Sequence, residues 1–176
     1  MTTAADGLLE RIMTDVSVNG LQDRSLRDLA AAAGTSHRLL LYHFGSRAGV
    51  VAAIVASVEA SQRAAFSALA EAHHEPAALV RALWRQVSAE EVRPFVRLFF
   101  EAVAYTGHGD GALTDRWLEE SRAVSARIGR SFDPVAIRLG VAVVRGLLID
   151  VLVTGDVEPA TRSLEHFLEL WQGHPA

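Results

Sequence analysis

The side chains best suited to chemistry lie in one short stretch, from Ser36 to Phe44. At about 100° per residue along a helix, Leu40 and Phe44 would share one side, and Arg38 and Tyr42 would fall nearly opposite them. An outward guanidinium can bind a guanine edge through two hydrogen bonds or hold a phosphate. The pattern predicts a helix with one side in the core and a polar side outside, although an ordinary surface helix with a few arginines fits it equally well.

Two predicted helices would hold that stretch in place. The first runs from Asp6 to Val18. The second begins at Ser25, a favourable N-cap residue, and Asp28 three positions later completes a capping-box pattern. The residues expected to point inward are Leu8, Leu9, Ile12 and Val16, then Leu26, Leu29 and Ala30. A turn at residues 33–36, with a glycine in it, gives the spacing of a helix-turn-helix that enters the major groove of DNA.

The local sequence resembles the TetR-type (tetracycline-repressor-like) family of transcriptional regulators. Residues 26–36, LRDLAAAAGTS, and residues 40–47, LLYHFGSR, follow that family's order of an alanine-rich helix, a glycine turn and a recognition helix, and the similarity extends from Leu8 to about Val55. The resemblance implies a homodimer that binds double-stranded DNA at a palindromic operator. It also implies a repressor that an unknown small-molecule effector releases from the operator.

The resemblance and the helical pattern together assign residues to DNA. Thr35 replaces the usual valine of the family, and Leu41 stands where a tyrosine often contacts phosphate. Arg38 occupies a position that is usually small or proline, which indicates a distinct operator preference. Leu39 has no hydrogen-bonding capacity, so outside it would suit only a thymine methyl or another apolar partner, and for Arg27 a solvated helix charge is an equal alternative. The residues expected to contact DNA are Ser25, Arg27, Thr35, Ser36, His37, Arg38, Leu39, Tyr42, His43 and Arg47.

The overall charge does not identify a nucleic-acid binder. The formal net charge is -4, and all 17 basic residues are arginine. Residues 1–47 carry five arginines and five acidic residues, so this segment is formally neutral. Binding would depend on a few well-placed arginines and on helix N-termini directed at phosphates. We therefore expect a shallower salt dependence than a strongly basic DNA-binding protein would show.

The rest of the chain predicts an all-α fold with about nine helices. We expect a DNA-binding domain at residues 1–46 and a ligand-binding and dimerisation domain at residues 47–176, connected by a helix from Arg47 to about His73. Aromatic residues are dense in this part, and an apolar cavity with a few polar groups is the usual small-molecule site. A plain aromatic core explains each residue equally well. The residues expected to line a ligand site are Trp84, Phe99, Tyr105 and Trp117.

The last two helices, about 134–154 and 158–172, are expected to form the dimer interface. The first is apolar nearly all round, and its Gly140 and Gly146 would permit close approach. A helix that is apolar all round must be buried on every side, and a partner subunit could cover the excess in a four-helix bundle. The second helix is expected to present Leu164, Phe167, Leu168 and Trp171 to that interface.

Enzymatic and metal chemistry have little support in the sequence. The absence of cysteine excludes disulfides, thiolate metal sites and cysteine nucleophiles. His73, His74 and Glu75 are adjacent and would point about 100° apart on a helix, so they cannot share one ion. His108 and Asp110 lie in a glycine-rich segment that lacks the lysine and the downstream helix of a phosphate-binding loop. We expect no enzyme activity, metal or cofactor; a helical enzyme, or a protein-interaction dimer that does not bind DNA, is the alternative.

The sequence also predicts a cytoplasmic protein without a membrane span. Residues 1–20 lack the basic start and the apolar block of a signal peptide. The most apolar run, residues 139–154, contains Arg145 and Asp150 and is too short to cross a bilayer.

Overall fold

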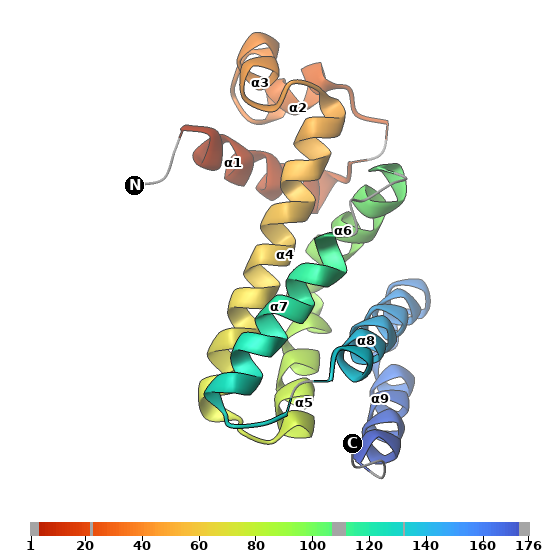
Figure 1. The fold of residues 1–176 in the computed structure, drawn as a ribbon. Helices are drawn as coiled ribbons and strands as arrows, with labels where there is room; N and C mark the ends of the chain where they lie inside the picture. The colour runs from red at the N-terminus through yellow and green to blue at the C-terminus, as the bar shows by residue number, and fades with distance from the viewer. Residues whose placement is uncertain (1–3, 22, 107–111, 132, 173–176) are drawn as a thin grey trace. The chain divides into compact units, whose positions relative to one another are not determined.

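The computed structural model of the chain describes residues 4–21, 23–106, 112–131 and 133–172. These residues form nine α-helices and one short 3-10 helix and contain no strand, which confirms the predicted all-α class (Figure 1). The helices are α1 Ala4–Asn19, α2 Leu26–Ala32, α3 His37–Phe44, α4 Arg47–Ala72, α5 Pro76–Val87, η1 Glu90–Val92, α6 Arg93–Thr106, α7 Ala112–Arg127, α8 Pro134–Thr154 and α9 Val157–Gln172.

The chain divides into two compact units. The first unit comprises Met1–Ala60 and Pro94–Gly109, and the second comprises Ser61–Arg93 and Asp110–Ala176. Helix α4 is continuous and contributes its first half to the first unit and its second half to the second. The boundary expected between residues 46 and 47 coincides with the start of α4, and as a division between functions it stays a prediction.

The core of the first unit is formed by the apolar faces of its helices. The buried side chains include Leu8, Ile12 and Val16 from α1, Leu26, Leu29 and Ala30 from α2, Leu40 from α3, and Val50, Val51 and Ile54 from α4. The predicted inward residues of α1 and α2 are therefore buried, with one exception. Leu9 is only partly buried, because it lies at the edge of the apolar face of α1.

The predicted capping box at the start of α2 is confirmed. The Ser25 hydroxyl oxygen accepts a hydrogen bond from the backbone N–H of Asp28 at 3.2 Å. The Asp28 carboxylate in turn accepts hydrogen bonds from the Ser25 hydroxyl at 2.6 Å and from the Ser25 backbone N–H at 2.7 Å. Because these bonds favour the ionised carboxylate, the hydroxyl first and the backbone N–H second, they lower the pKa of Asp28.

A Schellman motif ends α2 and sets the length of the turn. Gly34 has a φ of 62°, which a glycine adopts without steric cost. The N–H of Gly34 bonds to the carbonyl of Ala31 at 3.1 Å, and the N–H of Thr35 bonds to the carbonyl of Ala30 at 2.9 Å. The turn between α2 and α3 therefore occupies residues 33–36, as the sequence predicts.

Polar contacts join the helices of the second unit. The indole N–H of Trp84 on α5 donates to the Thr161 hydroxyl on α9 at 2.9 Å. The Arg81 guanidinium, also on α5, forms a two-oxygen ion pair with Glu165 on α9, at 2.8 and 2.9 Å from Nε. Arg81 stabilises the ionised carboxylate and lowers the pKa of Glu165. Helix α9 is thereby anchored to α5.

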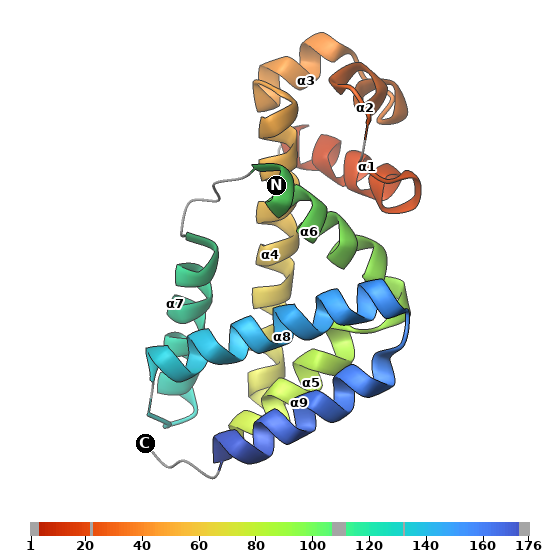
Figure 2. The same cartoon turned by 90° about the vertical axis from the view of Figure 1, so that its right-hand side faces the viewer.

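Helices α8 and α9 lie side by side, joined by a short turn (Figure 2). The expectation that α9 presents Leu164 and Leu168 to a partner subunit is wrong, because both side chains are fully buried inside the single subunit. Gly140 also faces inward, since a Cβ added there would lie 4.0 Å from the Trp171 ring of the same chain. A Cβ added at Gly146, by contrast, would meet nothing within 4 Å.

A helix that crosses a membrane must be both long and apolar. Among the described residues, no single helix is both long and apolar enough to cross a membrane. Helices α3 and α4 reach the required length and apolar content only when they are taken together, and they are bent by 62° relative to each other.

Candidate nucleic-acid interface

Helix α3 is short, and both of its ends are fixed by local hydrogen bonds. At its start, the Ser36 side chain accepts a hydrogen bond from the backbone N–H of Leu39 at 3.1 Å, as an N-cap residue does. At its end, Gly45 has a φ of 71°, and its N–H bonds to the carbonyl of Leu41 at 2.9 Å. The Ser46 hydroxyl then accepts from the N–H of Gly49 at 3.0 Å and caps α4. These bonds fix both ends of the eight-residue helix α3.

The orientation of α3 is the predicted one. Leu40 is fully buried and Phe44 partly buried, so this side of the helix packs on the unit. Arg38 is exposed, and 81% of the Tyr42 surface is exposed. The helix therefore presents a guanidinium and a phenol to the outside, the two groups that the sequence places there.

Two leucines flank this polar pair. Leu39 is 42% exposed and Leu41 is 40% exposed. From the helical rotation, Leu39 lies about 100° from Arg38 on one side, and Leu41 about 60° away on the other. The outward arc of α3 is therefore polar at its centre and apolar at both edges.

The remaining predicted contacts of α3 lie at its two ends. Thr35 and His37 are partly buried, and Ser36 is exposed, so all three lie at or next to the N-terminus of the helix. Near its C-terminus, His43 is partly buried and its ring meets that of Tyr42 edge to face, with centroids 5.0 Å apart. This contact limits the orientations that the two rings can adopt.

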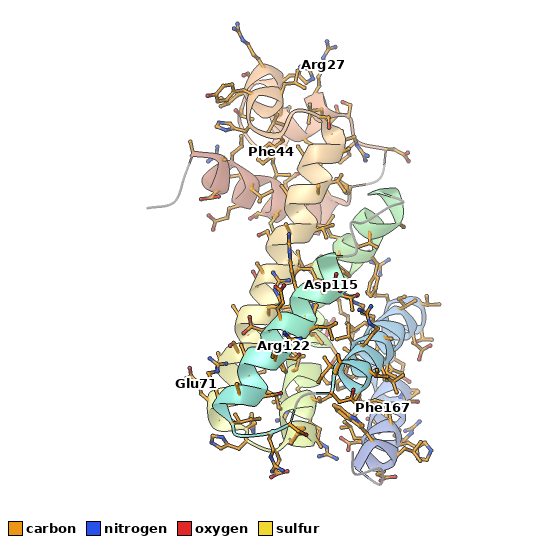
Figure 3. The ribbon with its side chains drawn as sticks, in the orientation of Figure 1. Arg27, Phe44, Glu71, Asp115, Arg122 and Phe167 are labelled. Atoms are coloured by element: carbon orange, nitrogen blue, oxygen red, sulfur yellow. The ribbon has the colours of Figure 1, made fainter. Side chains whose placement is uncertain are left out.

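Helix α2 adds a second exposed arginine. Arg27 is exposed, and its side chain extends away from the ribbon (Figure 3). Ser25, two residues earlier, is exposed as well, but its hydroxyl is engaged in the capping box with Asp28. Arg27 is therefore better placed than Ser25 to contact an anion outside the unit.

The other arginines of this region hold the fold. Arg11 Nε donates to the carbonyl of Ala33 at 3.0 Å and ties α1 to the turn. Arg24 forms an ion pair with Asp15. Of the five arginines up to residue 47, Arg27 and Arg38 are the ones for which the described residues provide no partner.

Arg47 has a structural role that the sequence did not indicate. Its Nε donates to the carbonyl of Arg24 at 2.7 Å, and its Nη2 donates to the carbonyl of Leu21 at 2.9 Å. These bonds fasten the start of α4 to the segment between α1 and α2. Because the partners are backbone carbonyls more than 20 positions away in the sequence, no side-chain pattern could have revealed them. The predicted contact of Arg47 with DNA stays a prediction.

The aromatic residues expected to line a ligand site are core residues where the structure describes them. Trp84 and Trp117 are buried in the second unit, the latter with its ring 5.8 Å from that of Phe66. Phe99 is buried and belongs to the first unit. The side chain of Tyr105 lies outside what the structure describes. Their role in ligand binding stays a prediction.

Histidine and acidic residues are the possible metal ligands in a chain without cysteine. In the part of the chain that the structure describes, no three or more histidine and acidic side chains are grouped so that they could hold an ion. His73, His74 and Glu75 follow the end of α4 in the segment before α5. His108 and Asp110 lie outside the described residues.

Comparisons with known proteins agree with this geometry. Residues 17–54, which include α2, α3 and the start of α4, match the family model of bacterial regulatory proteins of the tetR family. No curated protein has a matching sequence.

Solved structures match nearly the whole chain. A TetR-family transcriptional regulator from Pectobacterium atrosepticum is 20% identical, with a TM-score of 0.76 over 95% of this chain and 91% of that one. A protein from Rhodococcus sp. assigned to the same family is 23% identical, with a TM-score of 0.70 over 94% and 96%. SmeT, the repressor of the Stenotrophomonas maltophilia multidrug efflux pump SmeDEF, is 19% identical, with a TM-score of 0.63 over 91% and 84%. At these identities, the matches establish a shared fold.

Proposed function

We propose that the chain is a TetR-family DNA-binding transcriptional regulator, and more specifically a homodimeric repressor which a small molecule releases from a palindromic operator. The observation that carries the proposal is the orientation of α3, with Leu40 hidden and Arg38 and Tyr42 outside. Repression is the proposed direction because one protein of the same fold, SmeT, is described as a repressor. The setting we propose is the cytoplasm, where a bacterial regulator meets DNA.

The proposed DNA contacts fall into two groups. We propose that Arg38, near the N-terminus of α3, contacts a base edge in the major groove. The proposed phosphate contacts, which would fix the register of the protein on the duplex, are Tyr42 and His43 near the other end of α3 and Arg27 on α2. Ser25, Thr35, Ser36 and His37 lie around the same surface and complete the proposed interface with Leu39.

A repeated apolar stripe on α8 supports a homodimer. The stripe runs along the exposed side of the helix with alternating steps of four and three residues, the spacing of a seam between packed helices. It consists of Val135, Leu139, Ala142, Gly146, Ile149 and Val153. The four large side chains are between 48 and 80% exposed in the single subunit, which is costly unless a partner covers them.

We propose that two copies of α8 cross at the middle of this stripe. Ala142 and Gly146 are its smallest members, and small residues allow two helix axes to approach closely. On α9, Leu170 is 56% exposed, and it would extend the apolar contact beyond α8. A two-fold axis through the crossing would give two α3 helices and hence a palindromic operator.

Release by an effector requires two arrangements of the dimer with different affinities. The effector must bind the arrangement that does not hold DNA more tightly, and DNA must then weaken effector binding by the same factor. Helix α4 is the element proposed to connect the two events, because it contributes to both units. Trp84, Phe99, Tyr105 and Trp117 are the proposed lining residues.

Selection of bound duplexes from a random pool tests the DNA-binding part of this proposal. We expect enriched palindromes, and we expect Arg38→Ala to weaken binding to the selected operator by about 1–3 kcal/mol if Arg38 contacts a base. Arg85→Ala, which removes an exposed arginine of α5 in the second unit, is the matched control and should leave affinity unchanged. A pool without enrichment would favour the protein-interaction dimer instead.

A further inference from the structure

Three consecutive leucines in α3 have different surroundings. Leu40 is fully buried and supplies the contact of the helix with the core of the first unit. Leu39 and Leu41 are 42% and 40% exposed, so each presents a large part of its side chain outside that core. Neither can hydrogen-bond, so neither can hold a phosphate or a polar base edge. Their exposed surface can contribute to recognition only through contact with an apolar group.

The major groove offers one kind of apolar group at its base edges. The C5-methyl group of thymine projects into the groove, whereas the other edges there present hydrogen-bond donors and acceptors. A leucine that faces the floor of the groove therefore favours an A·T pair in one orientation. The same contact gives no discrimination against the other bases if the leucine faces the sugar-phosphate backbone.

The position along the helix distinguishes the two leucines. In helix-turn-helix proteins, the N-terminal residues of the second helix contact base edges. Leu39 is the third residue of α3 and follows Arg38 directly, while Leu41 lies two residues further on, beside Tyr42. A guanidinium and an isobutyl group are thus adjacent at the end of α3 that enters the groove.

We infer that Leu39 contacts the C5-methyl group of one thymine in each operator half-site, beside the base pair that Arg38 contacts. This inference rests on the proposed DNA-binding function and adds the identity of a base that it recognises. Leu41 contacts no thymine methyl and contributes little to sequence preference.

Deoxyuridine substitution tests the inference directly. Deoxyuridine pairs like thymidine and lacks only the C5-methyl group. Each thymine of the selected operator is replaced in turn, in both half-sites together, and the affinity of the full-length dimer is measured. From about 0.8 kcal/mol per buried methyl, we expect one position at which the doubly substituted operator binds about fifteenfold more weakly, and only small effects elsewhere.

Two variants assign the contact to a side chain. Leu39→Ala should weaken binding to the thymine operator and remove the difference between thymine and deoxyuridine at that position. Leu41→Ala, which truncates an equally exposed leucine of the same helix, should keep the difference. Because both residues are exposed, both variants should fold, and circular dichroism with a thermal melt verifies this.

The possible results distinguish failure of the Leu39 inference from failure of the proposed DNA-binding function. If no operator is selected, the proposed DNA-binding function fails. If an operator is selected but deoxyuridine has no effect at any position, the inference is overturned. It is also overturned if the deoxyuridine effect survives in Leu39→Ala or disappears in Leu41→Ala.

Discussion

Substitution of Gly146 by leucine should separate dimerisation from the folding of the subunit. A Cβ at this position would meet nothing within 4 Å in the single subunit, so the side chain has room. Replacement of a glycine inside a helix by a good helix former stabilises that helix by about 0.5–1 kcal/mol. We therefore expect a subunit with at least wild-type helix content.

The same change should weaken the dimer substantially. The exposed fractions of Val135, Leu139, Ile149 and Val153 together equal about two and a half side chains per subunit, so burying them in both subunits contributes about 8–15 kcal/mol. Association costs about 4–15 kcal/mol, so the net stability is a small difference. A leucine at the crossing would hold the two helices apart, and a gap of about 0.5–1 Å removes about a quarter to a half of the contact energy. A quarter of the lower value above is about 2 kcal/mol, which corresponds to a roughly thirtyfold higher dimer dissociation constant.

Sedimentation across a concentration series measures this effect, and circular dichroism verifies that the subunit is folded. Gly140→Ala is the control on the same helix, because Gly140 faces Trp171 of its own chain and a methyl group there makes an ordinary contact. It should leave the dissociation constant unchanged. A Gly146→Leu protein that dimerises as tightly as the wild type would refute the proposed crossing on α8.

Five further expectations concern the helix cap and the charged residues. Ser25→Ala should lower the free energy of unfolding by about 1 kcal/mol in a urea titration, because α2 loses its N-cap. Folding lowers the pKa of Asp28, so its contribution to stability is full above the ordinary carboxyl pKa and is lost as the pH falls through the folded-state pKa. In Asp28→Asn, the free energy of unfolding should therefore fall less steeply with decreasing pH. Arg47→Leu should cost about 1–3 kcal/mol in a urea titration, and a variant that keeps its stability and loses only operator binding would assign Arg47 to DNA instead. Arg81→Met should cost at most about 1 kcal/mol, less at high salt, because the ion pair with Glu165 is partly exposed. The slope of log affinity against log salt should be shallower than about -10.

The sequence predicted those features of the first unit that depend on local patterns. The spacing of Leu40 and Phe44 determined the buried side of α3, because apolar periodicity reflects burial directly. The capping box of Ser25 and Asp28 was predictable for a similar reason, since its partners lie three residues apart. The same spacing places Leu39 and Leu41 on either side of Leu40, but it does not determine how much of each side chain the neighbouring helices cover.

Contacts between distant segments were beyond such patterns. The bonds of Arg47 end on backbone carbonyls, which every residue has, so its side chain alone suggested an external anion. On α8, apolar residues surround the helix almost completely, and the sequence therefore gave no basis for choosing between Gly140 and Gly146 as the outward glycine. On α9, the sequence shows one apolar face but not whether its own subunit or a partner covers it, so Leu164 and Leu168 were assigned to the dimer although they complete the core of their own subunit.

The distribution of arginines links the proposed dimer to DNA affinity. Arg11, Arg24 and Arg47 make hydrogen bonds or ion pairs within the first unit, which leaves Arg27 and Arg38 as the cations that each subunit offers from this region. Two cations, of which only Arg27 is proposed to contact a phosphate, give too little phosphate binding for one subunit to bind tightly, since each contact adds only a modest, salt-dependent gain. Joining two half-site contacts makes the second one intramolecular and raises affinity by factors of about 10²–10⁴. A nearly neutral DNA-binding unit therefore needs the α8 stripe more than a strongly basic one would, and Gly146→Leu should reduce operator affinity at protein concentrations where Gly140→Ala does not.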